Sequence, residues 1–383
     1  MIITGEASGD AHAAKLVKRL RETSPDATFE FFGATGQKLR EENVETIVDS
    51  AHFSIVGLPE IARALPMFWR AFQMLKRAAE SRRPDVVILV DFPDFNLKLA
   101  KTLKKQNFKI IYYISPQLWA WRKYRVKTIK KSVDLLLTIL PFEKNWYVKQ
   151  GISHVEYVGN PLAGEVKSSL TKEEFCTQHK LNSNQPVIAL LAGSRYKEIA
   201  RILPILLETA SLMTKKNAEI QFIVALAATR SFAEVETAIS VAKKNRWQLP
   251  ETLITVMGET FEALNAADAA AVTSGTATLE TAIIGTPLAI VYKTSPFNYS
   301  LLRPLINVEN FGLINLIAHE TVAKEFIQNE FTAENLSAEL FRLMEKEENQ
   351  KIRLRLNEVT QTLGAGGTAR RAAGIILKFL QKI

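Results

Sequence analysis

Three short segments combine glycine with hydroxyl or charged residues at the point where an apolar run gives way to a helical pattern. They are Gly5–Asp10 (GEASGD), Gly193–Arg195 (GSR) and Thr273–Glu280 (TSGTATLE). Glycine lets a ligand approach the backbone closely, and the N–H groups at the start of a helix attract anions. We therefore expect phosphate contacts from Gly5, Ser8, Gly9, Gly193, Ser194, Ser274, Gly275 and Thr276. The competing interpretation is tight turns with ordinary helix caps such as Ser8 or Asp10, because Gly5–Asp10 is not a full dinucleotide fingerprint.

Two charged side chains accompany the second and third segments. Arg195 can pair with a phosphate through two N–H groups, and its charge can stabilise a departing diphosphate. Glu280 lies just over one helical turn beyond Ser274, so its carboxylate can reach ribose hydroxyls from the same end of the helix. The alternatives are that Arg195 has only a structural role and that Glu280 is a solvated surface residue.

Asp91 ends the hydrophobic run Asp85–Val90 within the segment VDFPDFN. An acid at the end of a buried strand is costly unless it has a role, and a carboxylate among aromatic residues suits a general base. Asp94 and Asn96 are candidate substrate contacts, and they can instead cap the helix that follows. We favour Asp91 as the base, although the sequence leaves Asp94 open as the alternative.

The segment Ser115–Arg125 (SPQLWAWRKYR) carries two tryptophans among cations. Aromatic faces with cationic neighbours suit contacts with a sugar, an acyl chain or a phosphate, which we assign to Trp119, Arg122 and Arg125. The alternative is a helix that packs its tryptophans and solvates its charges. Nucleic-acid binding could use the same residue types, but no module signature accompanies them.

The helical pattern over Pro59–Arg83 carries apolar residues on more than one face. A core-facing stripe is expected from Ile61, Leu65, Phe68, Phe72, Leu75 and Ala79. Met67 and Met74 fall outside that stripe among several arginines and lysines, with Trp69 nearby. A basic helix with extra apolar residues can lie on an anionic bilayer, so Met67, Trp69 and Met74 are the candidate membrane contacts. A solvated charged face is the alternative.

The elements that must position these residues follow from continuous apolar runs. Such runs are typical of parallel strands covered on both faces, and here they alternate with helical patterns such as His12–Glu22 and Ile199–Lys215. The runs are Asp85–Val90, Lys109–Ile114, Val133–Leu140, Val187–Ala192, Gln221–Leu226, Ala269–Thr273 and Leu288–Tyr292. The sequence therefore predicts α/β architecture with two doubly wound, Rossmann-like parallel-sheet domains and ligands at the carboxyl ends of their strands.

A break between two such series falls at Gly159–Thr171. We expect an N-terminal domain over 1–163, a C-terminal domain over 164–350 and a helical segment over 351–383 that packs on either domain. The chain has 383 residues, which suits two domains rather than one core.

Charge and cysteine content narrow the function further. The net charge of +9 favours anionic partners without choosing among them, and the single cysteine excludes an intrachain disulfide and a cysteine-based metal site. The five histidines lack ligand spacing. Neither a signal peptide nor an apolar stretch of about 18 residues is present, so we expect a cytoplasmic, peripheral protein.

Taken together, the motifs resemble those of the lipid-A-disaccharide synthase family, nucleotide-sugar glycosyltransferases of GT-B architecture. The matching stretches run co-linearly through nearly the whole chain. They are GEASGD (5–10), DFPDFN (91–96), YYISPQLWAWRKYRV (112–126), LPFEKNWY (140–147), YVGNPL (157–162), GSRYKEI (193–199), SGTATLE (274–280), GTPLAIVYK (285–293) and NLIA (315–318).

The resemblance implies a hexosyltransferase that joins UDP-2,3-diacylglucosamine to 2,3-diacylglucosamine 1-phosphate with inversion. It implies a C-terminal half that grips UDP across a cleft from an N-terminal half that takes the acylated acceptor. Asp91 would be the base, Arg195 the leaving-group stabiliser and Glu280 the ribose contact, with Asn315 near the phosphates. No Asp-x-Asp motif occurs, so we expect no metal and no cofactor.

The same resemblance suggests contact with anionic inner-membrane lipid on the cytoplasmic face, and it leaves room for a homodimer. Nucleic acid is not an expected partner. The rival interpretations are another GT-B enzyme such as a UDP-N-acetylglucosamine 2-epimerase, and a non-catalytic lipid- or nucleic-acid-binding protein.

Overall fold

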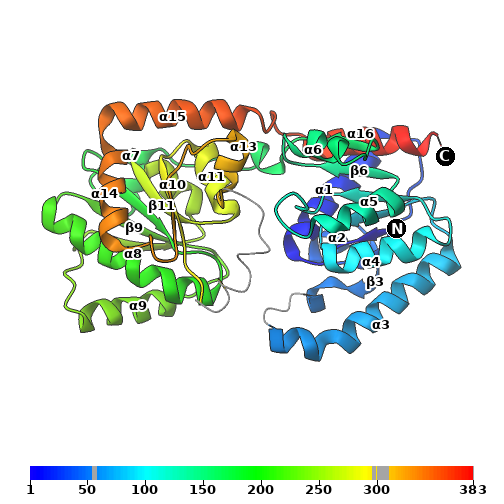
Figure 1. Ribbon diagram of the computed structural model, residues 1–383, viewed down its shortest axis with the longest axis horizontal. Helices are drawn as coiled ribbons and strands as arrows, with labels where there is room; N and C mark the ends of the chain where they lie inside the picture. The colour runs from blue at the N-terminus through cyan, green and yellow to red at the C-terminus, as the bar shows by residue number, and fades with distance from the viewer. Residues whose placement is uncertain (54–57, 296–298, 300–309, 383) are drawn as a thin grey trace. The chain divides into compact units, whose positions relative to one another are not determined.

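The computed structural model describes residues 1–53, 58–295, 299 and 310–382, and the chain divides into two compact units (Figure 1). The first unit comprises Met1–Pro161 together with Ala365–Ile383, and the second comprises Leu162–Gly364. The sequence places the first boundary after residue 163, and the two units divide after Pro161. The expected segment 351–383 is divided, because its first part belongs to the second unit and its last helix to the first.

The first unit is built on a seven-stranded sheet in which every pair is parallel, with the order β3-β2-β1-β4-β5-β6-β7. Its strands are β1 (Ile2–Ile3), β2 (Phe32–Thr35), β3 (Glu45–Asp49), β4 (Val87–Val90), β5 (Ile110–Tyr113), β6 (Leu135–Thr138) and β7 (Val155–Tyr157). The chain moves outward in one direction from β1 to β3 and then crosses back to β4. The strand order therefore reverses between β1 and β4.

Helices cover both faces of this sheet because successive strand residues point to opposite sides. Leu89 and Tyr112 join a core with α3 (Leu58–Arg82), α4 (Pro93–Lys104), α5 (Val126–Ser132) and α6 (Glu143–Lys149). Ile88 and Tyr113 join another core with α1 (Ala7–Thr23), α2 (Gln37–Glu41) and α16 (Thr368–Leu380). In Figure 1 the C-terminal helix α16 lies in this unit, where it contacts α1.

The second unit repeats the plan with six parallel strands in the order β10-β9-β8-β11-β12-β13. Its strands are β8 (Val187–Leu191), β9 (Gln221–Leu226), β10 (Leu253–Met257), β11 (Ala269–Thr273), β12 (Leu288–Tyr292) and β13 (Glu325–Ile327). Its helices are α7 (Lys172–Gln178), α8 (Tyr196–Lys216), α9 (Phe232–Lys244), α10 (Thr260–Ala266), α11 (Thr276–Ile284), α13 (Leu313–Ala318), α14 (Ala333–Met344) and α15 (Lys346–Gln361). Here the order reverses between β8 and β11.

The predicted α/β class with two parallel sheets is confirmed. Each of the seven apolar runs contains a strand, and three of them match its bounds: Gln221–Leu226, Ala269–Thr273 and Leu288–Tyr292. The apolar runs missed β2, a short buried strand inside the first sheet, and also β3 and β10, which lie at sheet edges and are only partly buried. An edge strand needs no continuous apolar sequence because one of its sides meets solvent. Within the described residues, no helix is both long enough and apolar enough to cross a bilayer.

Candidate active site

Four of the segments singled out by sequence meet in pairs at the two positions where strand order reverses. In the first unit the Gly5 turn follows β1 and Asp91 follows β4, and these two strands are neighbours. In the second unit Gly193 follows β8 and Ser274 follows β11, which are also neighbours. The loops diverge at such a point because the connections leave on opposite faces of the sheet, and this leaves a crevice for a ligand.

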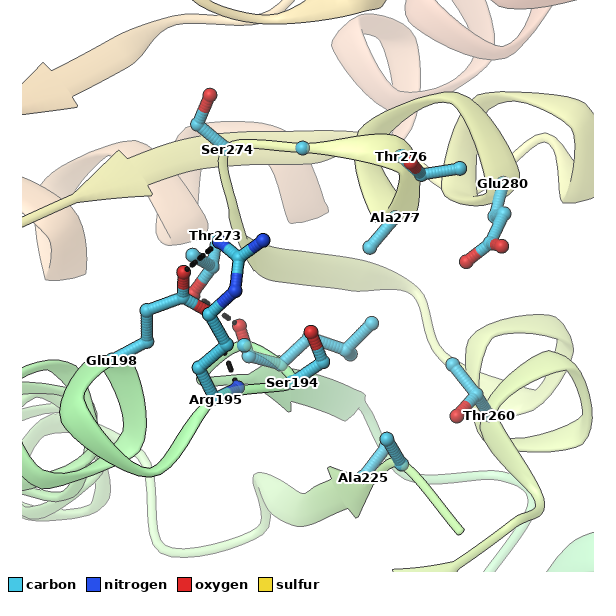
Figure 2. A pocket seen from close by; sticks show the side chains of 14 residues that line it. Ser194, Arg195, Glu198, Ala225, Thr260, Thr273, Ser274, Thr276, Ala277 and Glu280 are labelled. Carbon is cyan, nitrogen blue, oxygen red and sulfur yellow. Dashed lines mark hydrogen bonds and ion pairs between the residues drawn. The ribbon is translucent and has the colours of Figure 1, made fainter. Parts of the chain in front are cut away.

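The crevice of the second unit is a pocket of about 390 Å³ at the carboxyl ends of β8, β9 and β11 (Figure 2). It is lined by Leu191, Gly193, Ser194, Arg195, Glu198, Ala225, Ala227, Thr260, Thr273, Ser274, Gly275, Thr276, Ala277 and Glu280. Seven residues predicted to contact phosphate or ribose from this half of the chain therefore share one pocket. The structure does not place Asn315 among its lining residues.

Arg195 supplies the positive charge of this pocket. Its side chain is 69% exposed, and its Nη1 lies 3.1 Å from Oε1 of Glu198. The other Glu198 oxygen accepts a hydrogen bond from the Arg195 backbone N–H at 3.3 Å. A side chain on Gly193 would crowd this carboxylate, because a Cβ there would lie 2.6 Å from it. Glu198 thus orients Arg195, and an anion could compete for the exposed guanidinium.

The start of α11 supplies a second attraction for an anion. Gly275 precedes this nine-residue helix with φ 151°, and nothing lies within 4 Å of the position where its Cβ would stand. The first N–H groups of the helix lack partners within the helix, and its dipole places positive charge at this end. The Ser274 hydroxyl donates to the Phe311 carbonyl at 3.0 Å, so it also fixes the neighbouring loop.

Glu280 lies on α11 with its carboxylate directed toward the same space (Figure 2). Burial raises the pKa of this carboxyl above its ordinary value. A partly buried carboxylate without a cationic partner in the pocket wall is suited to accept hydrogen bonds from a ligand's hydroxyl groups.

In the first unit, the backbone bends sharply at Asp91. Asp91 and Phe92 both have positive φ, at 48° and 51°. Residues other than glycine rarely adopt this backbone conformation. The Asp91 carbonyl accepts hydrogen bonds from the Tyr112 hydroxyl at 2.6 Å and from the Asn96 amide at 2.8 Å. Gly5 completes the arrangement, because any side chain there would overlap the Phe92 ring. Backbone strain held by surrounding contacts is typical of functional sites.

The side-chain pKa values of Asp91 and Asp94 shift in opposite directions. Burial raises the pKa of Asp91 from 3.8 to about 6, the nearby Glu6 carboxylate adds to this rise, and the Phe92 N–H partly opposes it. Burial also acts to raise the pKa of Asp94, but Arg125 and Arg122 outweigh it and hold that pKa below its ordinary value. A carboxylate with a raised pKa accepts a proton more readily, so these environments favour Asp91 over Asp94 as a base.

The aromatic and basic segment divides into an inner and an outer part. Trp119 points inward, where its indole N–H donates to Oε1 of buried Glu143 at 3.1 Å. The other oxygen of Glu143 accepts the Leu140 N–H at 3.0 Å. Trp121 and Tyr124 are exposed, at 38% and 69%. Trp119 therefore anchors the segment to the core, whereas Trp121 and Tyr124 form its exposed aromatic surface.

Two predicted ligand contacts are engaged within the fold, and we reassign them to structural roles. Asn96 is fully buried and its amide donates to the carbonyls of Val90 and Asp91. Asn315 makes four hydrogen bonds that use both amide donors and both acceptor positions of its oxygen, with Val322, Ala323 and Glu325. Asn96 thus holds the bend at Asp91, while Asn315 orders the loop before β13.

Of the remaining first-unit contacts, Ser8 is exposed on the first turn of α1 and Gly9 is buried beneath it. Asp10 caps a different helix, because its carboxylate accepts from the N–H groups of Gly36 and Lys38. A substrate therefore has access to Ser8 but not to Gly9.

Helix α3 keeps most of the stripe that its sequence suggested, because Leu75 and Ala79 lie in the core with Phe68 and Phe72 packed against it, but its first part differs. Met67 is partly buried against the core with Phe68 and Phe72, whereas Leu65 is 60% exposed. Trp69 and Met74 are exposed, at 65% and 49%. The predicted exposure of Met67 is therefore wrong, and Leu65 takes its place beside Trp69. The side chain of Ile61 lies outside the described residues.

Sequence reasoning overlooked several residues that shape these sites. Glu198, Glu6, Tyr112 and Glu143 act on the candidate residues from neighbouring turns or strands. Glu198 had a local signal, since an acid at the third position of a helix commonly closes a capping box. The partner of Tyr112 lies 21 positions away in sequence, so no local pattern identifies that contact.

Solved structures with the same arrangement of two parallel sheets include an epimerase and a glycosyltransferase. A putative UDP-N-acetylglucosamine 2-epimerase from Listeria monocytogenes superposes with a TM-score of 0.64 at 15% identity, covering 100% of this chain and 96% of that chain. A glycosyltransferase from Rickettsia africae gives 0.57 at 12% identity, covering 100% and 97%. The fold is therefore the GT-B fold, which both kinds of enzyme use.

Sequence comparison identifies the family. The Lipid-A-disaccharide synthetase family model matches residues 1–378. A lipid-A-disaccharide synthase from Trichlorobacter lovleyi is 41% identical over 383 residues, covering 100% of this chain and 97% of the relative. The chain belongs to the lipid-A-disaccharide synthase family.

Proposed function

We propose that this chain is an inverting glycosyltransferase of lipid A biosynthesis. It would join UDP-2,3-diacylglucosamine to 2,3-diacylglucosamine 1-phosphate, giving a β-1,6-linked disaccharide 1-phosphate and UDP. The observation that carries the proposal is the pocket between β8 and β11, where Arg195 and the start of α11 provide for a diphosphate and Glu280 for hydroxyl groups. Membership of the lipid-A-disaccharide synthase family supports acylated sugars as the two substrates.

In the proposed reaction, the acceptor's 6-hydroxyl oxygen attacks the anomeric carbon of the donor sugar. The carbon–oxygen bond to the diphosphate breaks, and its electron pair leaves with UDP. Asp91 takes the hydroxyl proton, which a carboxylate with a raised pKa does more readily than an ordinary one. Arg195 and the α11 dipole stabilise the charge that develops on the leaving diphosphate.

Incubation of the protein with both acylated substrates tests the reaction. Mass spectrometry should find the disaccharide 1-phosphate, with one UDP released per product. Arg195→Gln should lower kcat by roughly 10²–10³-fold, as removal of one transition-state donor does elsewhere. Arg201→Gln is the matched control, since this exposed arginine stands further along α8 and its variant should keep normal activity.

A different result would support the rival enzyme. Turnover of non-acylated UDP-N-acetylglucosamine to its 2-epimer, without a lipid product, would replace the transferase proposal with an epimerase. The absence of any product from the acylated pair under conditions that saturate both substrates would also contradict the proposal.

We also propose that α3 contacts an anionic membrane through Leu65 and Trp69. These residues are one helical turn apart and both are largely exposed, with Arg70 and Arg77 exposed nearby. A Leu65→Ser/Trp69→Ser variant should sediment less with vesicles containing phosphatidylglycerol. Leu354→Ser on α15 removes a similarly exposed apolar side chain and serves as the control. Equal sedimentation of all three proteins would contradict this contact.

A further inference from the structure

Two guanidinium groups in the first unit meet at a single carboxylate oxygen. Nη1 of Arg122 lies 2.6 Å from Oδ1 of Asp94, and Nη2 of Arg125 contacts the same oxygen. Asp94 stands in the first turn of α4, directly after the bend at Asp91. Two positive charges thus share one negative charge, and the cluster retains a net positive charge next to the proposed base.

The cluster lies at the surface, with the Asp94 side chain 62% exposed, but the backbone that carries Arg122 is strained and the segment before it is anchored in the core. Arg122 has a left-handed backbone with φ 55°, and its guanidinium lies 4.1 Å from the centre of the Trp121 ring. The segment behind it is fixed, because the Tyr147 hydroxyl donates to the Pro116 carbonyl at 2.7 Å and Glu143 holds Trp119. A preorganised cation site binds an anion with less loss of side-chain entropy.

Asp94 leaves most of the N–H donors of the two guanidinium groups unengaged. Each guanidinium carries five N–H donors, and Asp94 engages one nitrogen of each. The Arg122 side chain is 34% exposed, so a second anion can approach it. Lys123 is exposed beside it and adds positive charge. The arrangement suits an anion with several oxygens and more than one negative charge.

We propose that Arg122 and Arg125 bind the 1-phosphate of the acceptor sugar, and that Asp94 is the positioning residue that holds the two guanidinium groups together. A phosphomonoester fits better than a lipid phosphodiester, because its second charge and third free oxygen match two guanidinium groups. The identity of the acceptor rests on the proposed function, whereas the anion site rests on the contacts described here.

The test compares short-chain 2,3-diacylglucosamine 1-phosphate with the same lipid lacking the phosphate. Binding of each to the full-length protein is measured by titration calorimetry without donor, and turnover is measured by UDP release. Arg122→Gln/Arg125→Gln should weaken binding of the phosphorylated lipid about 100-fold, equivalent to two tenfold losses from two charge-assisted contacts. Binding of the phosphate-free lipid should not change.

Two further variants sharpen the result. Arg122→Lys/Arg125→Lys keeps the charge but loses the planar pair of N–H donors that each guanidinium presents. Its affinity for the phosphorylated lipid should therefore lie between those of the glutamine variant and the wild type. Lys101→Gln, at an exposed position further along α4, removes a charge without touching the cluster and should bind both lipids normally.

The proposal is overturned if the glutamine variant loses affinity for both lipids equally, or if it keeps the wild-type preference for the phosphorylated lipid. If the variant keeps that preference and also no longer sediments with phosphatidylglycerol vesicles, the arginines bind membrane headgroups instead. Failure of the proposed function has a different signature: selective binding of the phosphorylated lipid with no UDP release by the wild-type protein.

Discussion

Replacement of Asp91 by asparagine should make the protein more stable and less active at once. The pKa of the Asp91 carboxyl rises from 3.8 to about 6, mainly through burial and secondly through Glu6. This difference corresponds to a cost of about 3 kcal/mol at most for ionised Asp91 in the folded state. Asparagine carries no charge and tolerates the left-handed backbone at this position, so the cost should disappear.

The pH dependence of this gain follows from the raised pKa. Well below pH 3.8 the carboxyl is protonated in both folded and unfolded chains, so the wild-type protein bears no cost. As pH rises toward 6, the unfolded chain releases the proton while the folded chain retains it, and wild-type stability falls. The advantage of Asp91→Asn should therefore be about 3 kcal/mol at pH 8 and about 1 kcal/mol at pH 4.5.

Thermal melting of both proteins at the two pH values measures the difference. A gain of this size should raise the melting temperature of the first unit at pH 8 by about 2–4 °C per kcal/mol. Asp94→Asn is the matched control with the opposite sign, because Asp94 has a lowered pKa and its ionised form stabilises the fold. That variant should be less stable than wild type at pH 8, and its deficit should shrink as pH falls.

Activity is measured on the same preparations by UDP release. Asp91→Asn should lose roughly 10²–10⁴ in rate, the usual contribution of a general base. A melting temperature at or below that of wild type at pH 8, or a gain independent of pH, would refute the electrostatic reasoning. Retention of the wild-type rate would refute the role as base and leave the stability argument standing.

Three further perturbations test neighbouring parts of the site. Glu6→Gln should lower the pKa of Asp91. The acidic limb of the pH–rate profile, where protonation of the base reduces activity, should therefore move to lower pH. An unmoved limb would show that Glu6 does not act on the base. Gly5→Ala should destabilise the protein by about 1–3 kcal/mol in denaturant unfolding, because the added methyl overlaps the Phe92 ring, and unchanged stability would mean that the ring moves freely. Glu143→Gln should cost about 1–3 kcal/mol at pH 4, because one amide oxygen cannot accept both the indole N–H and the backbone N–H groups. Burial raises the pKa of Glu143 to about 7, so at pH 8 the variant also loses the cost of a buried carboxylate and its deficit should shrink. Melting at the wild-type temperature at pH 4 would show that these hydrogen bonds do not stabilise the segment.

The backbone at Asp91 connects stability with function. Two consecutive residues other than glycine in the left-handed region cost about 1–3 kcal/mol each, and a buried carboxylate adds to that cost. Tyr112 and Asn96 offset part of it through hydrogen bonds to the Asp91 carbonyl. The fold therefore maintains an unfavourable local conformation at the residue that we propose as the base.

The sequence by itself determined most of the central strands, although not β2, and the location of the glycine turns that line the pocket. Continuous apolar runs specify central parallel strands because both of their faces are covered, and Gln221–Leu226 and Ala269–Thr273 matched their strands throughout. The segments at Gly193 and Ser274 were also recognisable, because a glycine turn before a helix is a local pattern. Their meeting in one pocket follows from the strand order.

Only the tertiary structure decided which polar side chains face a ligand and which hold the fold. Asn96, Asn315 and Trp119 have residue types suited to binding, yet hydrogen bonds within the fold engage all three. Likewise, the 3.6-residue period gave most of the core-facing stripe of α3, but it did not decide that Met67 packs inward while Leu65 is exposed. These outcomes depend on the neighbours that the folded chain places around each side chain, and local sequence patterns do not encode them.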